Sequence, residues 1–296
     1  MTSDSTLLVT GASGHLGRQV IEALLAAKAG KVIGTTRDPA KLADLAAKGA
    51  EIRHADFDKP ETLAAAFAGA DRLLLISTDA VGADGKRIAR QRAAVKAAVA
   101  AGVKHIVYLS APAPYPTPEP SLIGDHYWTE QAIAASGVDF TFLRDHLYSD
   151  LLVYSLPHAI ETGTLYTATG TGGRSYVTRE DCARTAAAVL ATATGKSVLD
   201  VTGPAPLTQD EIAALASEIS GKPVKHVAVP AEGLRQGLTA AGLPAGLVEG
   251  LVAFDVAAAE GFHAITTSVV KDWTGREPQS IRDFLLANRA ALAPKG

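Results

Sequence analysis

The sequence predicts an α/β protein in which a doubly wound parallel sheet is followed by a small C-terminal α/β lobe. Over residues 6–110, short apolar runs alternate with longer amphipathic runs. A glycine-rich turn joins the first apolar run to the first amphipathic one, and the alternation stops after Arg144. Alternating strands and helices favour a parallel sheet with helices on both faces. Right-handed crossovers in such a sheet place ligands at the carboxyl ends of the strands.

The first 110 residues contain five apolar runs of strand length. We predict strands at Leu7–Thr10, Lys31–Thr35, Glu51–His54, Arg72–Ser77 and His105–Ser110. The amphipathic runs between them predict helices over Leu16–Ala29, Ala40–Lys48, Pro60–Ala66 and Gly85–Ala101. In the first of these helices, Leu16, Val20 and Leu24 recur at helical spacing and form one apolar face.

Prolines interrupt the pattern directly after the fifth strand. The stretch from Ala111 to Pro120 holds five prolines, which exclude a helix or a central strand there. Further strands are predicted at Phe140–Leu143 and Val198–Val201, and the chain from Asp145 through the Gly/Thr-rich stretch 163–174 is predicted to be irregular. The later helices are predicted at Leu122–Ala135, Arg179–Ala191, Leu207–Ser220, Ala231–Ala241, Leu243–Ala258 and Pro278–Ala291.

Composition excludes several classes of protein. The 296 residues carry a net charge of −3 without a basic run, which argues against a nucleic-acid partner. The one cysteine, Cys182, excludes an internal disulfide framework and is expected to be buried packing. The polar start, Met1 to Thr6, predicts no signal peptide, and no apolar run is long enough to predict a membrane span. A soluble cytoplasmic protein is the default expectation.

Two kinds of catalytic site are also unsupported by the sequence. The eight histidines form no H-E-x-x-H pattern, so we expect no metal site. The run from Gly11 to Gly14 does not have the G-x-S-x-G spacing, so a serine hydrolase is not indicated.

The stretch from Thr10 to Gly17 has the spacing G-x-x-G-x-x-G between a predicted strand and a predicted helix. In a Rossmann-type sheet, Gly11 permits the tight turn, Gly14 lets the backbone approach a pyrophosphate, and Gly17 lets the helix pack closely on the strand. The N–H groups that begin the helix then face the phosphates. The alternative is a plain turn. The candidate cofactor residues here are Gly11, Ala12, Ser13, Gly14, His15, Leu16 and Gly17.

The residues after the second strand favour NADP(H) over NAD(H). Arg37 lies 20 residues after Gly17, where an arginine suits the 2′-phosphate of NADP. Lys41 follows on the same helical face and adds a second positive charge. Asp38 has two interpretations, since it can contact a ribose or cap the helix that Pro39 begins. The alternative for Arg37 is a solvated surface residue.

The next two strand ends supply further cofactor candidates. Asp56 can bind the adenine amino group and Phe57 can cover the ring, or the two residues can be a helix-start carboxylate and a core side chain. Ser77 and Thr78 follow the fourth strand, where their backbone and hydroxyl groups can line the cofactor.

The sequence resembles the NmrA-like group of atypical short-chain dehydrogenases/reductases, especially its type 2 NADPH:quinone oxidoreductases and triphenylmethane reductases. The resemblance covers nearly the whole chain. It is carried by TGASGHLG at 10–17, TTRDPAK at 35–41, HADFDKPETL at 54–63, LLLIS at 73–77, AAGVKHIVYLS at 100–110, DHYWTEQAIAASGVDFTFLR at 125–144 and TGREPQSIRDFL at 274–285. The stretch 125–144 and the tail are the more specific parts.

The resemblance implies a Rossmann domain over residues 1–150 and a smaller lobe over 151–296, some of whose segments rejoin the sheet. The substrate would lie in a cleft between them. It also implies NADPH-dependent hydride transfer to a planar conjugated small molecule, such as a quinone or a cationic dye, and is compatible with a homodimer. The alternatives are a non-catalytic NADP-binding redox sensor that regulates a partner, or a reductase of another enone or aromatic substrate.

The chain departs from the Tyr-x-x-x-Lys pair that related alcohol dehydrogenases use as an acid. His126 stands at the lysine position and Leu122 at the tyrosine position, while Tyr127 is one residue away. Hydride transfer to a conjugated acceptor needs mainly orientation, so it remains open without a strong acid. His126 can supply a proton or bind the ribose, or it can be an ordinary surface histidine.

Further residues at the later strand ends are candidates for the substrate site. Ser110 ends the fifth strand, at the position that matches the active-site Ser or Thr of the wider superfamily. Tyr148 can stack on a planar acceptor, or be a buried tyrosine with a hydrogen-bond partner. The candidate catalytic residues are thus His126, Ser110 and Tyr148, and the candidate substrate residues are Tyr115, Asp145 and His146. Where this chain has Asp145, the resembling family usually has Asn.

Overall fold

The structure is a computed structural model that describes residues 5–78, 84–117 and 121–293. Its main sheet has the strand order β3-β2-β1-β4-β5-β6-β8. The strands are β1 (Thr6–Val9), β2 (Lys31–Thr36), β3 (Glu51–His54), β4 (Arg72–Leu75), β5 (His105–Ser110), β6 (Asp139–Asp145) and β8 (Lys196–Val201). The neighbouring strands from β3 through β6 pair in parallel. The predicted Rossmann-type doubly wound sheet is therefore confirmed, and the direction of winding reverses between β1 and β4.

Contacts along the chain divide it into two units. The N-terminal unit comprises Met1–Arg144, Glu180–Asp200 and Asp272–Gly275. The C-terminal unit comprises Asp145–Arg179, Val201–Lys271 and Arg276–Gly296. The domain division expected at residue 150 stays a prediction.

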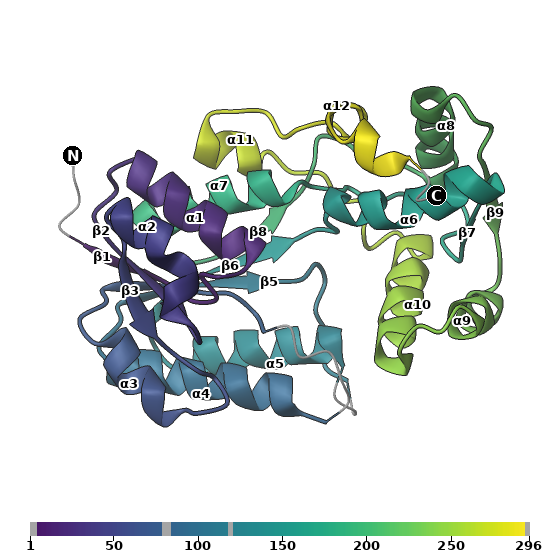
Figure 1. Cartoon of the computed structure of the whole chain (residues 1–296). Coiled ribbons are helices and arrows are strands. Elements are labelled where there is room, and N and C mark those ends of the chain that lie inside the picture. Colours follow the sequence, from purple (N-terminus) through teal and green to yellow (C-terminus); the bar gives the residue numbers. More distant parts are fainter. Residues whose placement is uncertain (1–4, 79–83, 118–120, 294–296) are drawn as a thin grey trace. The chain divides into compact units, whose positions relative to one another are not determined.

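Helices cover both faces of the main sheet (Figure 1). Helices α3, α4 and α5 lie along one face, and α1 and α7 lie along the other. Their bounds are α1 (His15–Ala26), α3 (Glu61–Phe67), α4 (Lys86–Ala100), α5 (Leu122–Ala135) and α7 (Arg179–Thr192). These five helices confirm the predicted positions to within three residues. The helix predicted at Ala40–Lys48 is instead a 3₁₀ turn, η1 (Pro39–Leu42), that continues into α2 (Ala43–Ala47).

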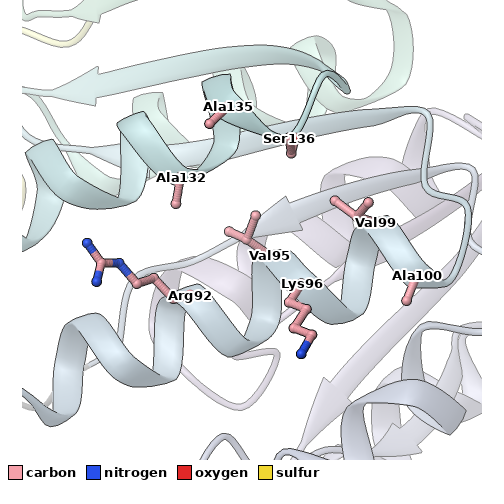
Figure 2. Close-up of a pocket in the computed structure, with 8 residues that line it drawn as sticks. All are labelled: Arg92, Val95, Lys96, Val99, Ala100, Ala132, Ala135 and Ser136. Atoms are coloured by element: carbon pink, nitrogen blue, oxygen red, sulfur yellow. The ribbon is translucent and has the colours of Figure 1, made fainter.

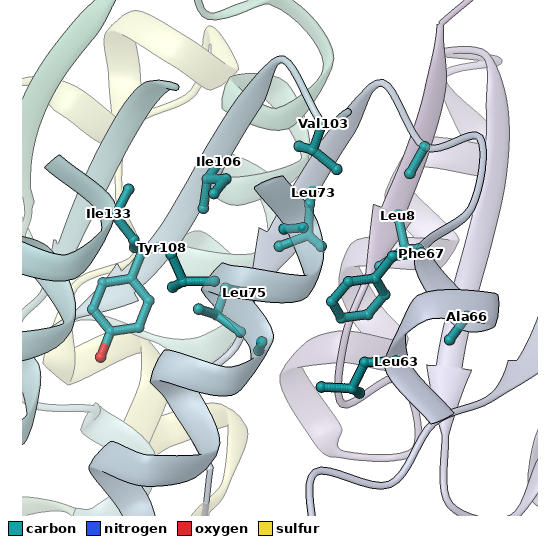
Figure 3. Close-up of a cluster of buried hydrophobic side chains, with 14 of the residues drawn as sticks. Leu8, Leu63, Ala66, Phe67, Leu73, Leu75, Val103, Ile106, Tyr108 and Ile133 are labelled. Carbon is teal, nitrogen blue, oxygen red and sulfur yellow. The ribbon is translucent and has the colours of Figure 1, made fainter. Parts of the chain in front are cut away.

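One hydrophobic cluster joins the sheet to α3, α4 and α5, as Figure 3 shows. Leu8 of β1 is opposite Leu73 of β4, which is opposite Ile106 of β5, so all three side chains lie in one row across the sheet. Phe67 of α3 and Ile133 of α5 are buried against this face. Because each such side chain contributes about 1.5–3 kcal/mol when fully buried, the row stabilises the central strands whose ends carry the candidate site.

The C-terminal unit has its own sheet, in which β7 (Thr164–Thr167) and β9 (Lys225–Ala228) are parallel. Its helices are α6 (Leu152–Thr162), α8 (Gln209–Ser220), α9 (Ala231–Ala240), α10 (Ala245–Ala259) and α12 (Ile281–Ala287), with 3₁₀ turns η2 (Ser149–Leu151) and η3 (Arg289–Leu292). A further helix, α11 (Val269–Thr274), spans residues of both units. The core of this unit includes Leu156, Ile160, Ile212 and Leu285.

The predicted irregular region after Asp145 is wrong, because η2, α6 and β7 lie within it. Helix α6 contains Pro157, which removes a helix hydrogen bond, yet its Leu152, Leu156 and Ile160 are buried in the core. Burial of this apolar face outweighs the local cost of the proline. The predicted last helix is also too long, since Ser280 caps α12 and the chain turns at Asn288.

Among the described residues, no helix is both long enough and apolar enough to cross a bilayer. The buried cysteine is confirmed, since Cys182 is fully buried in α7.

A buried histidine in β5 gives the N-terminal unit a pH-dependent stability. His105 is buried, and its Nε2 lies 3.1 Å from the Thr141 hydroxyl. Burial, together with the charge of Arg72, lowers the pKa of His105 from 6.5 to about 4. The unfolded chain therefore binds a proton below pH 6.5 that the folded chain does not bind. We expect the free energy of unfolding to fall by about 3 kcal/mol, from this residue alone, between pH 6.5 and pH 4.

The measurement is chemical denaturation at several pH values. The His105→Gln variant should show a shallower fall, because glutamine takes up no proton in this range. The His54→Gln variant removes an exposed histidine from β3 and serves as the control. If His105→Gln keeps the slope of the wild type, His105 does not stay neutral in the folded protein.

Candidate functional site

The glycine-rich turn between β1 and α1 has the geometry that its spacing predicts. Gly11 has a φ of +60°, in the left-handed region, and its carbonyl accepts the Gly14 N–H at 3.0 Å. A Cβ atom on Gly17 would lie 2.5 Å from the Gly11 carbonyl oxygen, so only glycine fits there. The Ala12 N–H donates to the Thr35 carbonyl at 3.0 Å, which ties the turn to β2. Gly11 takes the left-handed conformation that a tight turn requires, and Gly17 lies against the backbone of Gly11 and Ala12.

The turn presents the start of α1 toward solvent. Ser13, Gly14 and His15 are exposed, whereas Ala12 and Leu16 are buried beneath them. Gly14 is the N-cap residue of α1, and no side chain in the described part of the chain caps the helix. The N–H groups of the first turn, with the positive end of the helix dipole, therefore remain available to an anion. This is the arrangement that binds a pyrophosphate; that the predicted residues bind one stays a prediction.

Arg37 stands exposed directly after β2 and makes no hydrogen bond or ion pair with any residue that the structure describes. Asp38 caps η1, since its Oδ1 accepts the Ala40 N–H at 3.2 Å. Of the two interpretations of Asp38, the structure therefore shows the helix cap. Lys41 is also exposed, with its Nζ 3.9 Å from the Asp38 carboxylate. Two cations thus lie on the segment that follows β2.

Arg18, which the sequence argument did not single out, supports this segment. Its guanidinium donates to the Asp44 carboxylate and, at 3.2 Å, to the Lys41 carbonyl. Because Arg18 directly follows Gly17, it links the glycine-rich turn to η1 and α2. Its position one residue after the glycine motif could have identified Arg18 from the sequence.

Asp56 and Phe57, at the end of β3, have local structural roles. The Asp56 carboxylate accepts the Asp58 N–H at 3.0 Å, and the Asp56 N–H donates to the Thr62 hydroxyl at 3.0 Å. Phe57 is half-buried and packs against the main cluster. Contact of either residue with an adenine stays a prediction.

The end of β4 lies beside the glycine-rich turn. The Thr10 hydroxyl accepts the Ile76 N–H at 2.9 Å, and a Cβ on Gly11 would touch the Ile76 side chain. Ser77 and Thr78 follow and are half-buried. These two predicted residues are therefore close to the turn, at the place where the winding of the sheet reverses.

His126 is buried in α5, so its interpretation as a surface histidine is wrong. Its Nε2 lies 3.1 Å from an Arg87 guanidinium nitrogen, and its Nδ1 lies 2.9 Å from the Tyr108 hydroxyl. Tyr108 in turn donates to Gln91 Oε1 at 2.9 Å. The same Arg87 donates to the carbonyl of Thr78. This buried chain of hydrogen bonds links α5 and α4 to the segment after β4.

Arg87 determines which group donates in each hydrogen bond of this series. Arginine only donates, so His126 Nε2 accepts, and the imidazole proton lies on Nδ1, which donates to Tyr108. Burial, with the positive charge of Arg87, lowers the pKa of His126 well below its usual value. The imidazole is therefore neutral, with both nitrogens engaged. Its predicted catalytic role stays a prediction, and the geometry favours a positioning role.

If the protein oxidises NADPH, as the resemblance implies, the pH–rate profile of that reaction should show no inflection from His126 between pH 5 and 8. His126→Leu should lower the free energy of unfolding by about 1–3 kcal/mol, since it leaves a buried Arg87 N–H without its acceptor and the Tyr108 oxygen without its donor. His126→Gln should lose less, because its side-chain oxygen can accept from Arg87. Denaturation curves and pH–rate profiles of the three proteins check this.

An inflection near pH 6.5 that disappears in both variants would contradict the neutral assignment. It would restore His126 as a proton donor.

Ser110, at the end of β5, belongs to a second buried polar cluster. Its hydroxyl donates to Glu130 Oε1 at 2.7 Å. Arg144 holds the same carboxylate with two hydrogen bonds, at 3.0 Å to Oε1 and 2.8 Å to Oε2. Ser110 and Glu130 are buried, and the Arg144 side chain is one-quarter exposed. The hydrogen bonds that Arg144 donates to Glu130 raise the pKa of Arg144 above its usual value.

The remaining candidate site residues lie in the C-terminal unit or, for Tyr115, in the proline-rich stretch after β5. The Tyr148 hydroxyl donates to Asp145 Oδ2 at 3.0 Å, and Arg179 lies 4.9 Å above the Tyr148 ring. His146 is buried with its ring 6.3 Å from that of His263. Tyr115 is 57% exposed. Tyr148 thus has the hydrogen-bond partner that its second interpretation required, and the substrate roles of Asp145, His146 and Tyr115 stay predictions.

Sequence reasoning did not identify Arg87, Tyr108, Arg144 or His263 as members of these clusters. Each is a polar residue within an otherwise regular helix, strand or loop, and no motif marks it. Among the described residues, no three His, Cys, Asp or Glu side chains are grouped to hold a metal ion.

A groove of about 440 Å³ lies between α4 and α5, as Figure 2 shows. Val95, Val99, Ala132 and Ala135 line it, with Arg92 and Lys96 at its rim. Apart from Arg92, near the middle of α4, its residues lie in or directly after the C-terminal halves of both helices, which lead into the amino ends of β5 and β6. The groove is therefore remote from the carboxyl ends of the strands, and we place the candidate cofactor site at the glycine-rich turn instead.

Comparison with known proteins decides the family. The profile of the NAD(P)H-binding family matches residues 11–193, which begin at the first glycine of the turn. The chain belongs to the NAD(P)H-binding family. This member of the family is 37% identical to quinone oxidoreductase 2 of Escherichia coli over 86% of this chain and 88% of that protein.

Solved structures of two similar proteins support the same assignment. The NADPH-dependent quinone oxidoreductase of E. coli, complexed with NADPH, matches with a TM-score of 0.89 and 33% identity over 95% of this chain and 99% of that chain. Triphenylmethane reductase of Citrobacter sp. matches with a TM-score of 0.85 and 34% identity over 97% and 99%. The resemblance drawn from the sequence is confirmed.

Proposed function

We propose that the protein is an NADPH-dependent oxidoreductase that transfers hydride to a planar conjugated acceptor, such as a quinone or a cationic dye. The observation that carries the proposal is the uncapped start of α1, directly behind a turn in which a Cβ at Gly17 would meet the Gly11 carbonyl. Similar proteins named for quinone and triphenylmethane reduction support the acceptor class. Reduced nicotinamide, when bound, supplies the hydride.

The residues present fit an NADP(H) cofactor. The first-turn N–H groups of α1 would bind the pyrophosphate. Exposed Arg37, with Lys41 on the same segment, would bind the 2′-phosphate, for which the planar guanidinium is suited. The segment of Ser77 and Thr78 would lie along the cofactor toward β5. A preference for NADPH over NADH therefore rests on Arg37.

The chain would contribute orientation more than acid catalysis. Arg87 donates to the Thr78 carbonyl and to the neutral His126, which connects the segment that would lie beside the cofactor to α4 and α5. Holding a hydride donor against a conjugated acceptor lowers the entropic part of the barrier. The proton that completes reduction of a quinone would then come from water. Tyr148, beside Asp145, is a candidate to contact the planar acceptor.

The test is NADPH consumption by the purified protein against a panel of quinones and cationic dyes, with NADH as the control. Turnover that is faster with NADPH supports the proposal. If NADPH binds in a calorimeter but is not consumed with any acceptor, the protein is better described as an NADP-binding redox sensor. The sensor is the second candidate because His126 is neutral and engaged, so this helix offers no free acid at that position.

A further inference from the structure

We propose that Ser110 binds the amino group of the nicotinamide carboxamide as a hydrogen-bond acceptor, and that Glu130 and Arg144 fix Ser110 in this role. The inference rests on the proposed function, because it concerns how the NADP(H) cofactor is held. It gives Ser110 the opposite hydrogen-bond polarity from a serine that donates to a substrate carbonyl.

The polarity follows from the two bonds that Arg144 makes. A carboxylate that accepts from both Nε and a terminal nitrogen of arginine is ionised, and each of its oxygens then only accepts. Ser110 lies 2.7 Å from Glu130 Oε1, so the serine must supply the proton of that bond. Its one hydroxyl proton is thereby committed to Glu130. The Ser110 oxygen keeps lone pairs, which can only accept a hydrogen bond from another group.

Burial keeps the Ser110 hydroxyl proton directed at Glu130. Ser110 is 5% exposed and Glu130 is 3% exposed, so water has little access to compete for the bond. Turning the hydroxyl toward another acceptor would leave Glu130 Oε1 without one of its donors inside the protein. Loss of a hydrogen bond to a buried charged group is costlier than loss of a bond between neutral groups.

The position of Ser110 selects the group that it would meet. It ends β5, beside β4, whose following segment adjoins the glycine-rich turn. A cofactor that extends from this turn along the carboxyl ends of β4 and β5 brings its nicotinamide toward Ser110. A quinone presents only carbonyl acceptors, whereas the carboxamide of nicotinamide presents N–H donors. The donor that complements Ser110 therefore belongs to the cofactor.

The experiment compares NADPH with its reduced 3-acetylpyridine analogue, in which a methyl group replaces the carboxamide amino group. Dissociation constants of both ligands are measured for the wild type and for Ser110→Ala. We expect the wild type to favour NADPH by roughly three- to tenfold more than Ser110→Ala does, which is the range of one hydrogen bond. Intrinsic differences between the two ligands cancel in this comparison.

Glu130→Gln is the second variant, and it separates polarity from packing. The glutamine can place either its oxygen or its amide nitrogen beside Ser110, and in the second orientation it donates to the Ser110 oxygen, which frees the serine proton to donate toward the acetyl carbonyl. We expect the preference for NADPH to fall in this variant. Ser136→Ala is the matched control, since its hydroxyl donates to the Ile133 carbonyl at the far end of α5 and its loss should leave the preference unchanged. Denaturation curves verify that each variant is folded.

Two results would overturn the inference. If Ser110→Ala weakens both ligands by the same factor, or weakens neither, Ser110 does not bind the carboxamide even though NADPH binding stands. If the wild type binds neither ligand, the proposed function fails and the inference fails with it. The first result leaves the proposed function intact, so the two failures are distinguishable.

Discussion

The Gly17→Ala variant is expected to weaken NADPH binding by roughly 10- to 100-fold. Its new Cβ would lie 2.5 Å from the Gly11 carbonyl oxygen and 3.0 Å from the Gly11 carbonyl carbon. These are backbone atoms, so the turn or α1 must move to relieve the contact. A movement of the turn displaces the N–H groups that would bind the pyrophosphate. Overpacking of this kind also lowers the free energy of unfolding by about 1–3 kcal/mol.

Calorimetric titration with NADPH and chemical denaturation measure the two effects. The matched control is Gly237→Ala, at an exposed helical glycine of α9 where an added Cβ meets nothing within 4 Å. This control should gain about 0.5–1 kcal/mol of stability, because alanine favours a helix, and should bind NADPH as the wild type does. Unchanged NADPH affinity in a destabilised Gly17→Ala variant would show that the turn does not hold the cofactor.

The Arg37→Asp variant is expected to weaken NADPH binding by about 100-fold, with less than about a threefold effect on NADH. Arg37 is exposed and has no partner among the described residues, so its loss breaks no internal contact. The variant removes charge-assisted hydrogen bonds to the 2′-phosphate and places a like charge beside it. NADH lacks this phosphate, so it should be nearly insensitive.

The control for overall charge is Arg92→Asp, which makes the same change at an exposed position of α4, on the rim of the groove. It should leave the ratio of the NADPH and NADH dissociation constants unaltered. Equal losses for both cofactors in Arg37→Asp would show that Arg37 does not contact the 2′-phosphate. In that case the cofactor preference would have to come from another group, of which Lys41 is the first to test.

The first half of the fold could be predicted because its signals are local. Strands such as β3 and β5 are bounded by turns and by polar residues, and the helices between them have one apolar face. Each parallel crossover then follows the usual hand, so the order of elements along the chain nearly determines their order in the sheet. The glycine-rich turn is predictable for the same reason, since Gly11 and Gly17 act within eight residues of each other.

The C-terminal unit was less predictable because its signals are not local. The partners β7 and β9 lie about 60 residues apart in the sequence, and each is only four residues long. Pro157 marks α6 as an unfavourable helix, and only its buried apolar face explains why it forms. Short elements with weak local preference take their structure from the surface on which they pack.

The Rossmann-type sheet, the glycine-rich turn and the position of Arg37 after the second strand were all predictable from the residues alone. Periodicity and local turn geometry carry that information. The burial of neutral His126 beside Arg87, and the hydrogen bond from Ser110 to Glu130, follow from long-range packing that the sequence does not reveal. Apolar residues occur around much of α5, so its sequence did not indicate which side would be buried. Burial then decides protonation and hydrogen-bond polarity, because a charge or an unpaired polar group is costly away from water.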